Sequence, residues 1–329
     1  MFPETVRWRS PGPLLALAMF LGLLLVPLIS SWLGQSFYLS FATRIVVYAI
    51  AASGLNLILG YAGMVSLGQS LFVGLGAYAV GIGSFHGLTN GWLQLGLALA
   101  LTAVVATLTG LVSLRTRGIG FIMITLAFGQ MFYFLAVSLK DYGGDDGLPI
   151  DQRSVFSSLA SLDNKVTLYY LALAVLVVLM YAIWRVVHGQ FGYVLRGFRV
   201  NERRMLAAGF PRLRYQLTAY VAAALTCTLS GFLLGNLTAF ASPSYMSWQM
   251  SGDLILIVVL GGMGTVMGPL VGAFVLLVLE EMLSGFTQHW MAILGPIILL
   301  VALLAKRGIW GGMTDVRRDR SATAGEVQQ

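Results

Sequence analysis

The chain has 329 residues, of which 58% are hydrophobic and only 10% are charged, and its formal net charge is +7. Soluble domains carry about a quarter charged residues, so this composition excludes a soluble globular protein and predicts a one-domain, all-α polytopic membrane protein. The positive charge does not indicate a nucleic-acid partner, because the arginines gather in short segments between apolar runs, as they do in cytoplasmic loops.

The apolar runs predict about 8–10 transmembrane elements, since a helix needs about 20 apolar residues to cross a bilayer. In chain order the longer runs are Leu14–Leu33, Phe41–Leu59, Ser66–Ser84, Trp92–Leu114, Ile119–Ser138, Thr167–Val187 and Gln216–Phe240. The later runs are Asp253–Leu260, Thr265–Glu281 and Met291–Ala305. The first of these three is too short to cross alone, so the pattern leaves open whether 253–281 crosses twice or is re-entrant.

The charges between the runs predict the orientation, because arginine and lysine concentrate on the cytoplasmic side. Alternating spans then place residues 1–13, the basic segment 188–215 and the tail 306–329 in the cytoplasm. The loop 139–166 carries five acids against three bases and falls on the opposite side. The transmembrane domain between the two termini covers residues 14–305.

The region around the basic segment, Arg185–Arg214, contains seven arginines and a single acid, Glu202. Its centre predicts a short helix: Asn201 can cap the first turn, Gly209 suits the left-handed position after the last turn, and Pro211 prevents continuation. About two turns are too few to persist in water. The helix therefore either docks on a partner or belongs to a loop that only fixes topology.

Two glycine-rich interruptions share the pattern L-G-x-x-G, at Leu59–Gly63 and Leu260–Gly264. Paired breaks of this kind indicate a translocation site near the middle of the membrane; the alternative is that these glycines only let helices approach closely. Neutral polar residues in the neighbouring runs can line a path or join helices. The predicted path residues are Asn56, Gly60, Tyr61, Gly63, Ser66, Gln69, Tyr78, Thr125, Gln130, Gly261, Gly262 and Gly264.

Several motifs are absent from the sequence. No P-loop occurs, and no pattern typical of a metal site or a catalytic centre is present, so the chain itself is predicted to be no enzyme and to hold no cofactor. The carboxylates of Asp253, Glu280 and Glu281 fall at the ends of the predicted runs. Ion-driven carriers usually keep an ionisable group inside the membrane, so these positions argue against such a carrier.

Several blocks of the sequence resemble the LivM-type permeases, the membrane subunits of ABC importers for branched-chain amino acids. The blocks are Gly54–Gln69 with Gly74–Tyr78, Arg117–Gln130, Gly143–Leu148, Asn201–Arg204 with Ala208-Gly209, and Val259–Gly264 with Gly268-Pro269. Together they span about residues 40–305. Many relatives carry histidine where this chain has Gln69.

The resemblance implies an ABC importer permease fold in the bacterial inner membrane, with 139–166 in the periplasm. It also implies four partner chains: a LivH-type permease, two cytoplasmic ATPase subunits that bind ATP and Mg, and a periplasmic binding protein. Segment 188–215 then becomes the coupling segment that docks on an ATPase, through Arg199, Asn201, Glu202, Arg203, Arg204 and Gly209. Leucine, isoleucine or valine is the implied cargo. A urea or short-chain amide permease is the alternative, and an ATP-independent channel or carrier is the rival mechanism.

Overall fold

A computed structural model of the chain describes residues 19–27, 36–157, 160–162, 164–286, 289–304 and 308–312. The predicted segment 1–13, parts of the predicted first span and most of the tail lie outside these residues. Within the first span, residues 19–27 are helical.

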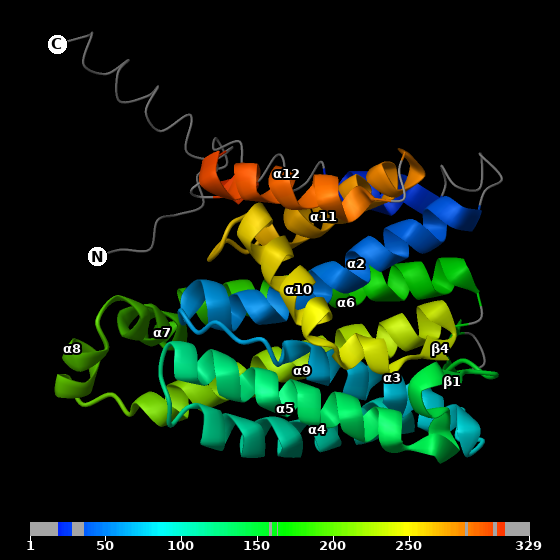
Figure 1. Cartoon of the computed structure of the whole chain (residues 1–329), viewed down its shortest axis with the longest axis horizontal. Helices are drawn as coiled ribbons and strands as arrows, with labels where there is room; N and C mark the ends of the chain where they lie inside the picture. Colours follow the sequence, from blue (N-terminus) through cyan, green and yellow to red (C-terminus); the bar gives the residue numbers. More distant parts are fainter. Residues whose placement is uncertain are drawn as a thin grey trace, which may run out of the picture.

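The described chain consists almost entirely of helices; most of the long ones run roughly along one direction, and α10 crosses them obliquely (Figure 1). The helices are α2 (Ser36–Asn56), α3 (Gln69–Phe85), α4 (Gly91–Ser113), α5 (Ile119–Ser138), α6 (Lys165–His188), α7 (Gln190–Val200), α8 (Glu202–Ala207), α9 (Arg212–Thr238), α10 (Trp248–Gly261), α11 (Gly268–Phe286) and α12 (Trp290–Leu304). Six helical segments are long and apolar enough to cross a membrane, and three shorter apolar helices accompany them among the described residues. The predicted all-α polytopic fold is confirmed.

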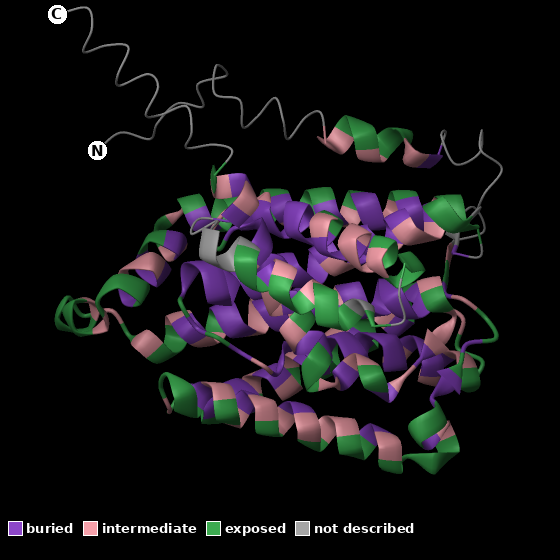
Figure 2. Ribbon diagram, turned by 45° about the horizontal axis from the view of Figure 1, so that its top comes forward, coloured by how far each residue is buried: buried purple, intermediate pink, exposed green. Residues whose placement is uncertain are grey.

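Helices α2 and α9 form the centre of the bundle, where α9 packs against α2, α3 and α4. Figure 2 shows buried residues concentrated in the middle of the bundle and exposed residues on its outer helices. In the most apolar part of the α2 span 89% of the residues are buried, whereas in that of α5 only 22% are, so α5 lies at the periphery. Small residues permit this close packing: a Cβ at Gly54 would lie 1.8 Å from Thr226 Oγ1 of α9.

Short strands and 3-10 turns close one end of the bundle. Strand β1 (Leu148–Pro149) pairs antiparallel with β4 (Phe240–Ala241), and β2 (Val155–Ser157) pairs with β3 (Ala160–Ser161). The 3-10 turns are η2 (Lys140–Tyr142), η3 (Gly144–Asp146) and η4 (Pro243–Met246). Ladders of two or three residues leave no periodic signal in a sequence, so none was predicted. We call this the β1 end and the opposite one, where α7 and α8 project, the α8 end (Figure 1).

The predicted run limits at Asp253 and Glu281 are wrong. Helix α10 begins at Trp248 and α11 continues to Phe286, so Asp253, Glu280 and Glu281 lie within helices. The predicted runs begin at Asp253 and end at Glu281, whereas helix geometry continues through both acids. The carboxylate of Asp253 has Arg44 of α2 and Glu280 of α11 as charged neighbours.

Candidate functional site

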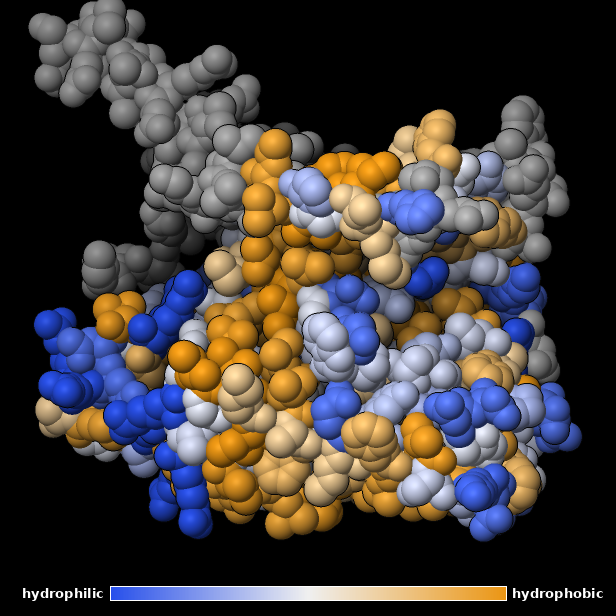
Figure 3. Space-filling model, viewed as in Figure 1, coloured by the Kyte–Doolittle hydropathy of each residue, from blue (hydrophilic) through white to orange (hydrophobic). Residues whose placement is uncertain are grey.

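The coupling segment, 188–215, contains the predicted short helix and one further helix. Asn201 caps α8 by accepting a hydrogen bond from the Arg204 backbone N–H at 3.0 Å, and Gly209 follows in the left-handed conformation with φ +86°. These two predictions are confirmed. Helix α7 precedes it and was not predicted. It buries Leu195 and Phe198, and hydrophilic atoms cover this end of the molecule in Figure 3.

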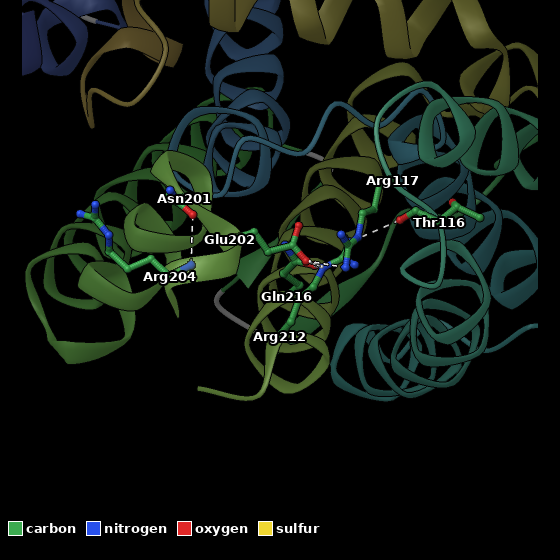
Figure 4. Close-up of polar contacts among 7 residues, drawn as sticks. All are labelled: Thr116, Arg117, Asn201, Glu202, Arg204, Arg212 and Gln216. Atoms are coloured by element: carbon green, nitrogen blue, oxygen red, sulfur yellow. Dashed lines mark hydrogen bonds and ion pairs between the residues drawn. The ribbon is translucent and has the colours of Figure 1, made fainter. Parts of the chain in front are cut away.

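Glu202 connects α8 to the rest of the bundle. Its Oε1 lies 2.9 Å from Arg117 Nη2, in the turn between α4 and α5, and 3.2 Å from Arg212 Nε at the start of α9 (Figure 4). Arg212 also donates to Gln216 Oε1 at 2.8 Å and to the Thr116 carbonyl at 3.3 Å. The one acid of the basic segment therefore joins α8, the α4–α5 turn and the start of α9 within the chain.

The two arginines that follow Glu202 are more exposed than Glu202 itself. The predicted contacts of Glu202, Arg203 and Arg204 with an ATPase need exposed side chains. Arg203 and Arg204 are exposed, while the Glu202 side chain is 25% exposed and ion-paired inside the chain. The outward surface of α8 is thus cationic.

The last turn of α7 reaches the first glycine break. Arg199 Nη1 donates to the Gly60 carbonyl, and the stem of Arg199 lies against Gly63. Gly60 belongs to a π-helical turn, η1 (Leu57–Tyr61), that ends α2 before the irregular residues 62–68. Turns of this kind occur frequently at functional sites.

The second glycine break contacts the first through Asn56. The Asn56 side chain accepts from the Gly264 N–H at 2.9 Å and donates to the Thr265 carbonyl at 2.8 Å. A Cβ at Gly60 would lie 2.4 Å from the Gly264 nitrogen, so only glycine permits this approach. We call Asn56, Gly60, Arg199, Gly264 and Thr265 the break junction. It places both L-G-x-x-G segments next to the coupling segment.

Three other predicted path residues lie near the start of α3. Thr125 Oγ1 accepts from the Leu67 N–H at 3.3 Å, and Ser66 Oγ accepts from the Gly68 N–H at 3.3 Å. The side-chain Oε1 of buried Gln69 accepts from Cys227 Sγ at 3.6 Å, while its Nε2 has no hydrogen-bond partner among the described residues. These residues connect α3, α5 and α9.

The remaining predicted path residues are dispersed. Tyr61 is buried beside Ile183 and Val187 of α6, Tyr78 is buried in α3, and Gln130 is half-buried on α5. Gly261 packs against Gly268, and Gly262 ends α10. The structure thus brings the break residues together without gathering all candidates around one cavity, and their role in a path stays a prediction.

Comparison with known proteins identifies the family of this chain. The family described as "Branched-chain amino acid transport system / permease component" matches residues 37–304. The chain belongs to this family. It is therefore a multi-pass membrane protein and a transport subunit, not itself an enzyme, and the predicted family membership is confirmed. In ABC transporters of this kind ATP is generally bound by partner subunits.

Two relatives give the family match more detail. The chain is 27% identical over 292 residues to the high-affinity branched-chain amino acid transport system permease protein LivM of Escherichia coli (strain K12). It is equally similar to the LivM protein of Salmonella typhimurium (strain LT2). Each alignment covers 82% of this chain and 68% of the relative. No solved structure matches the chain.

Proposed function

We propose that this chain is one of two permease subunits of an ATP-driven importer in the bacterial inner membrane, and that it carries branched-chain amino acids. The family and the printed function of both LivM relatives support this cargo. The partners in the proposal are a LivH-type permease, two ATPase subunits that bind ATP and Mg, and a periplasmic binding protein. The α8 end faces the cytoplasm, with both termini on that side and loop 139–166 in the periplasm.

The break junction is the observation that supports coupling most strongly. A force on α8 reaches α4, α5 and α9 through the ion pairs of Glu202, and it reaches α2, α10 and α11 through Arg199 and Asn56. Packed elements of this type shift between discrete arrangements rather than deforming continuously. ATPase closure therefore moves the two breaks together, and the helices that they end change between outward- and inward-facing positions.

The ion-driven carrier is the rival mechanism, and the position of Asp253 inside α10 removes one objection to it. An ionisable group within a membrane helix is a functional candidate. The two mechanisms differ in their energy source. An importer of the proposed kind requires ATP and the binding protein, whereas a carrier requires only an ion gradient.

Uptake in proteoliposomes tests the proposal. The chain is reconstituted with its neighbouring permease, ATPases and binding protein, and labelled leucine and urea are offered separately with or without internal ATP. Leucine uptake that needs both ATP and the binding protein is expected. Uptake of urea without uptake of leucine would show that the transported solute is urea. Uptake that does not depend on ATP would refute the coupling mechanism. A complex with hydrolysis-deficient ATPases is the matched control.

Replacing Glu202 and Arg203 together by alanine tests the coupling segment. The double variant should insert and assemble with its partner permease, because both residues lie outside the buried core. It should lose uptake and the stimulation of ATP hydrolysis. If both activities survive, the coupling role of α8 is wrong.

A further inference from the structure

A cavity of about 200 Å³ opens at the α8 end, where the coupling segment, the α4–α5 turn and the first break meet. Its volume is far above the roughly 10–15 Å³ that one water needs. It is below the roughly 300–1,000 Å³ of sites for drug-sized ligands. The cavity therefore has the size of a site for one small organic molecule.

Both apolar and charged side chains line the cavity. Met64, Phe121, Ile122 and Phe198 supply the apolar part. Of the predicted path residues in the described chain, Gly63 alone lines this space. An apolar wall of this kind favours an aliphatic group, because each buried CH₂ contributes roughly 0.8 kcal/mol.

The charged part of the lining consists of three arginines and one carboxylate. Arg117, Arg199 and Arg212 line the cavity together with Glu202. A guanidinium has five N–H donors in a fork that suits a carboxylate. Arg199 uses Nη1 on Gly60, and its other nitrogens can bind a ligand.

Glu202 is incompletely satisfied in this arrangement. Both arginine nitrogens approach Oε1 within ion-pair distance, yet this buried oxygen receives no well-directed hydrogen bond from the described residues. Buried polar atoms almost always have such a donor. Because three arginines outnumber this one carboxylate, an ammonium group can donate to it favourably only when it brings its own anionic group, as in a zwitterion.

We propose that this cavity is an inner binding site for a small zwitterion with an aliphatic side chain, occupied before release into the cytoplasm. The carboxylate of the ligand lies against Arg199, its ammonium against Glu202, and its side chain against Phe121 and Ile122. The inference rests on the proposed function and deepens it. Since α7 and α8 form part of the wall, movement of the coupling segment changes the affinity of the site and drives release.

Direct binding tests this site apart from transport. The membrane complex with its ATPases, without nucleotide and without the binding protein, is placed in nanodiscs and titrated with labelled leucine. Leucinamide lacks the carboxylate and 4-methylpentanoate lacks the ammonium, so each should compete at least tenfold more weakly than leucine. A 4-methylpentanoate affinity equal to that of leucine would show a simple anion site and overturn the proposal.

The Ile122→Trp variant fills the cavity and should weaken leucine binding at least tenfold. Met123→Trp is the matched control, because Met123 is the next residue of α5 and is 59% exposed. Val65→Trp, in the break, is a second cavity-filling variant if the first does not insert. Unchanged leucine affinity in an inserted cavity-filling variant would overturn the proposal. A cavity-filling variant that loses ATPase assembly but keeps its leucine affinity would overturn it as well. ATP-dependent uptake by the unaltered complex is measured separately, so the importer proposal stands or fails independently.

Discussion

Replacing Asn56 by leucine tests the break junction most sharply. Asn56 is 1% exposed, and its amide makes two hydrogen bonds to the second break. Each broken pair leaves a backbone group unsatisfied, which costs about 1–3 kcal/mol. Gly264 and Thr265 are half-buried, so water can replace part of the loss. We therefore expect a decrease of about 2–3 kcal/mol in the free energy of unfolding.

The functional effect should be larger than the stability effect. Without the amide, the two hydrogen bonds from α2 to the second break are lost, although the helices still pack. ATP hydrolysis should therefore continue while leucine uptake falls at least tenfold. The assay measures the melting temperature of the purified complex, its ATPase activity and its uptake in proteoliposomes.

Ser53→Ala is the control for the Asn56 variant, one turn earlier on α2. Ser53 is also buried, but its hydroxyl donates to the Ala49 carbonyl of its own helix at 2.7 Å and to no other helix among the described residues. This variant should keep both activities and lose at most about 1 kcal/mol. An Asn56→Leu complex that melts and transports like the unaltered one would refute the role of the junction.

Three further variants probe separate contacts. Gly261→Ala should prevent folding or insertion, because its Cβ would lie 1.8 Å from the Gly268 carbonyl oxygen. Gly252→Ala is the control, because a Cβ at this position of the same helix meets no atom within 4 Å, and this variant should express normally. Equal yields of the two variants would contradict the packing. Asn201→Ala should remove about 1 kcal/mol of capping from α8 and reduce ATPase stimulation. Asn90→Ala, which removes the cap of α4 at the other end, should not reduce that stimulation. Glu202→Gln should lower the free energy of unfolding by only about 1 kcal/mol, since partly exposed pairs contribute little. It should still weaken coupling, measured as leucine imported per ATP hydrolysed; an unchanged ratio would contradict the ion-pair link.

The sequence predicted features that depend on neighbouring residues. Apolar runs located the long helices because burial in lipid requires such runs. Asn201 and Gly209 located α8 because capping is a local interaction, and both L-G-x-x-G breaks interrupt helices as expected.

Contacts between distant segments were not predictable from pattern alone. Asn56 and Gly264 are 208 positions apart, and neither residue type specifies the other. Arg117 and Arg212 were visible as charges, yet nothing local assigned them to Glu202. Helix α7 was missed although its sequence carries a signal: Phe191, Val194, Leu195 and Phe198 recur at the spacing of one helix face, and this face packs on the bundle.

The most direct test of the account is the coupling ratio of an Arg199→Met complex. Methionine keeps an apolar stem beside Gly63 but cannot donate to the Gly60 carbonyl, so it removes the hydrogen bond that links α7 to the first break. We predict that the ATPases still assemble and hydrolyse ATP, while leucine imported per ATP falls at least tenfold. An unchanged ratio would show that the coupling segment does not act through the break junction.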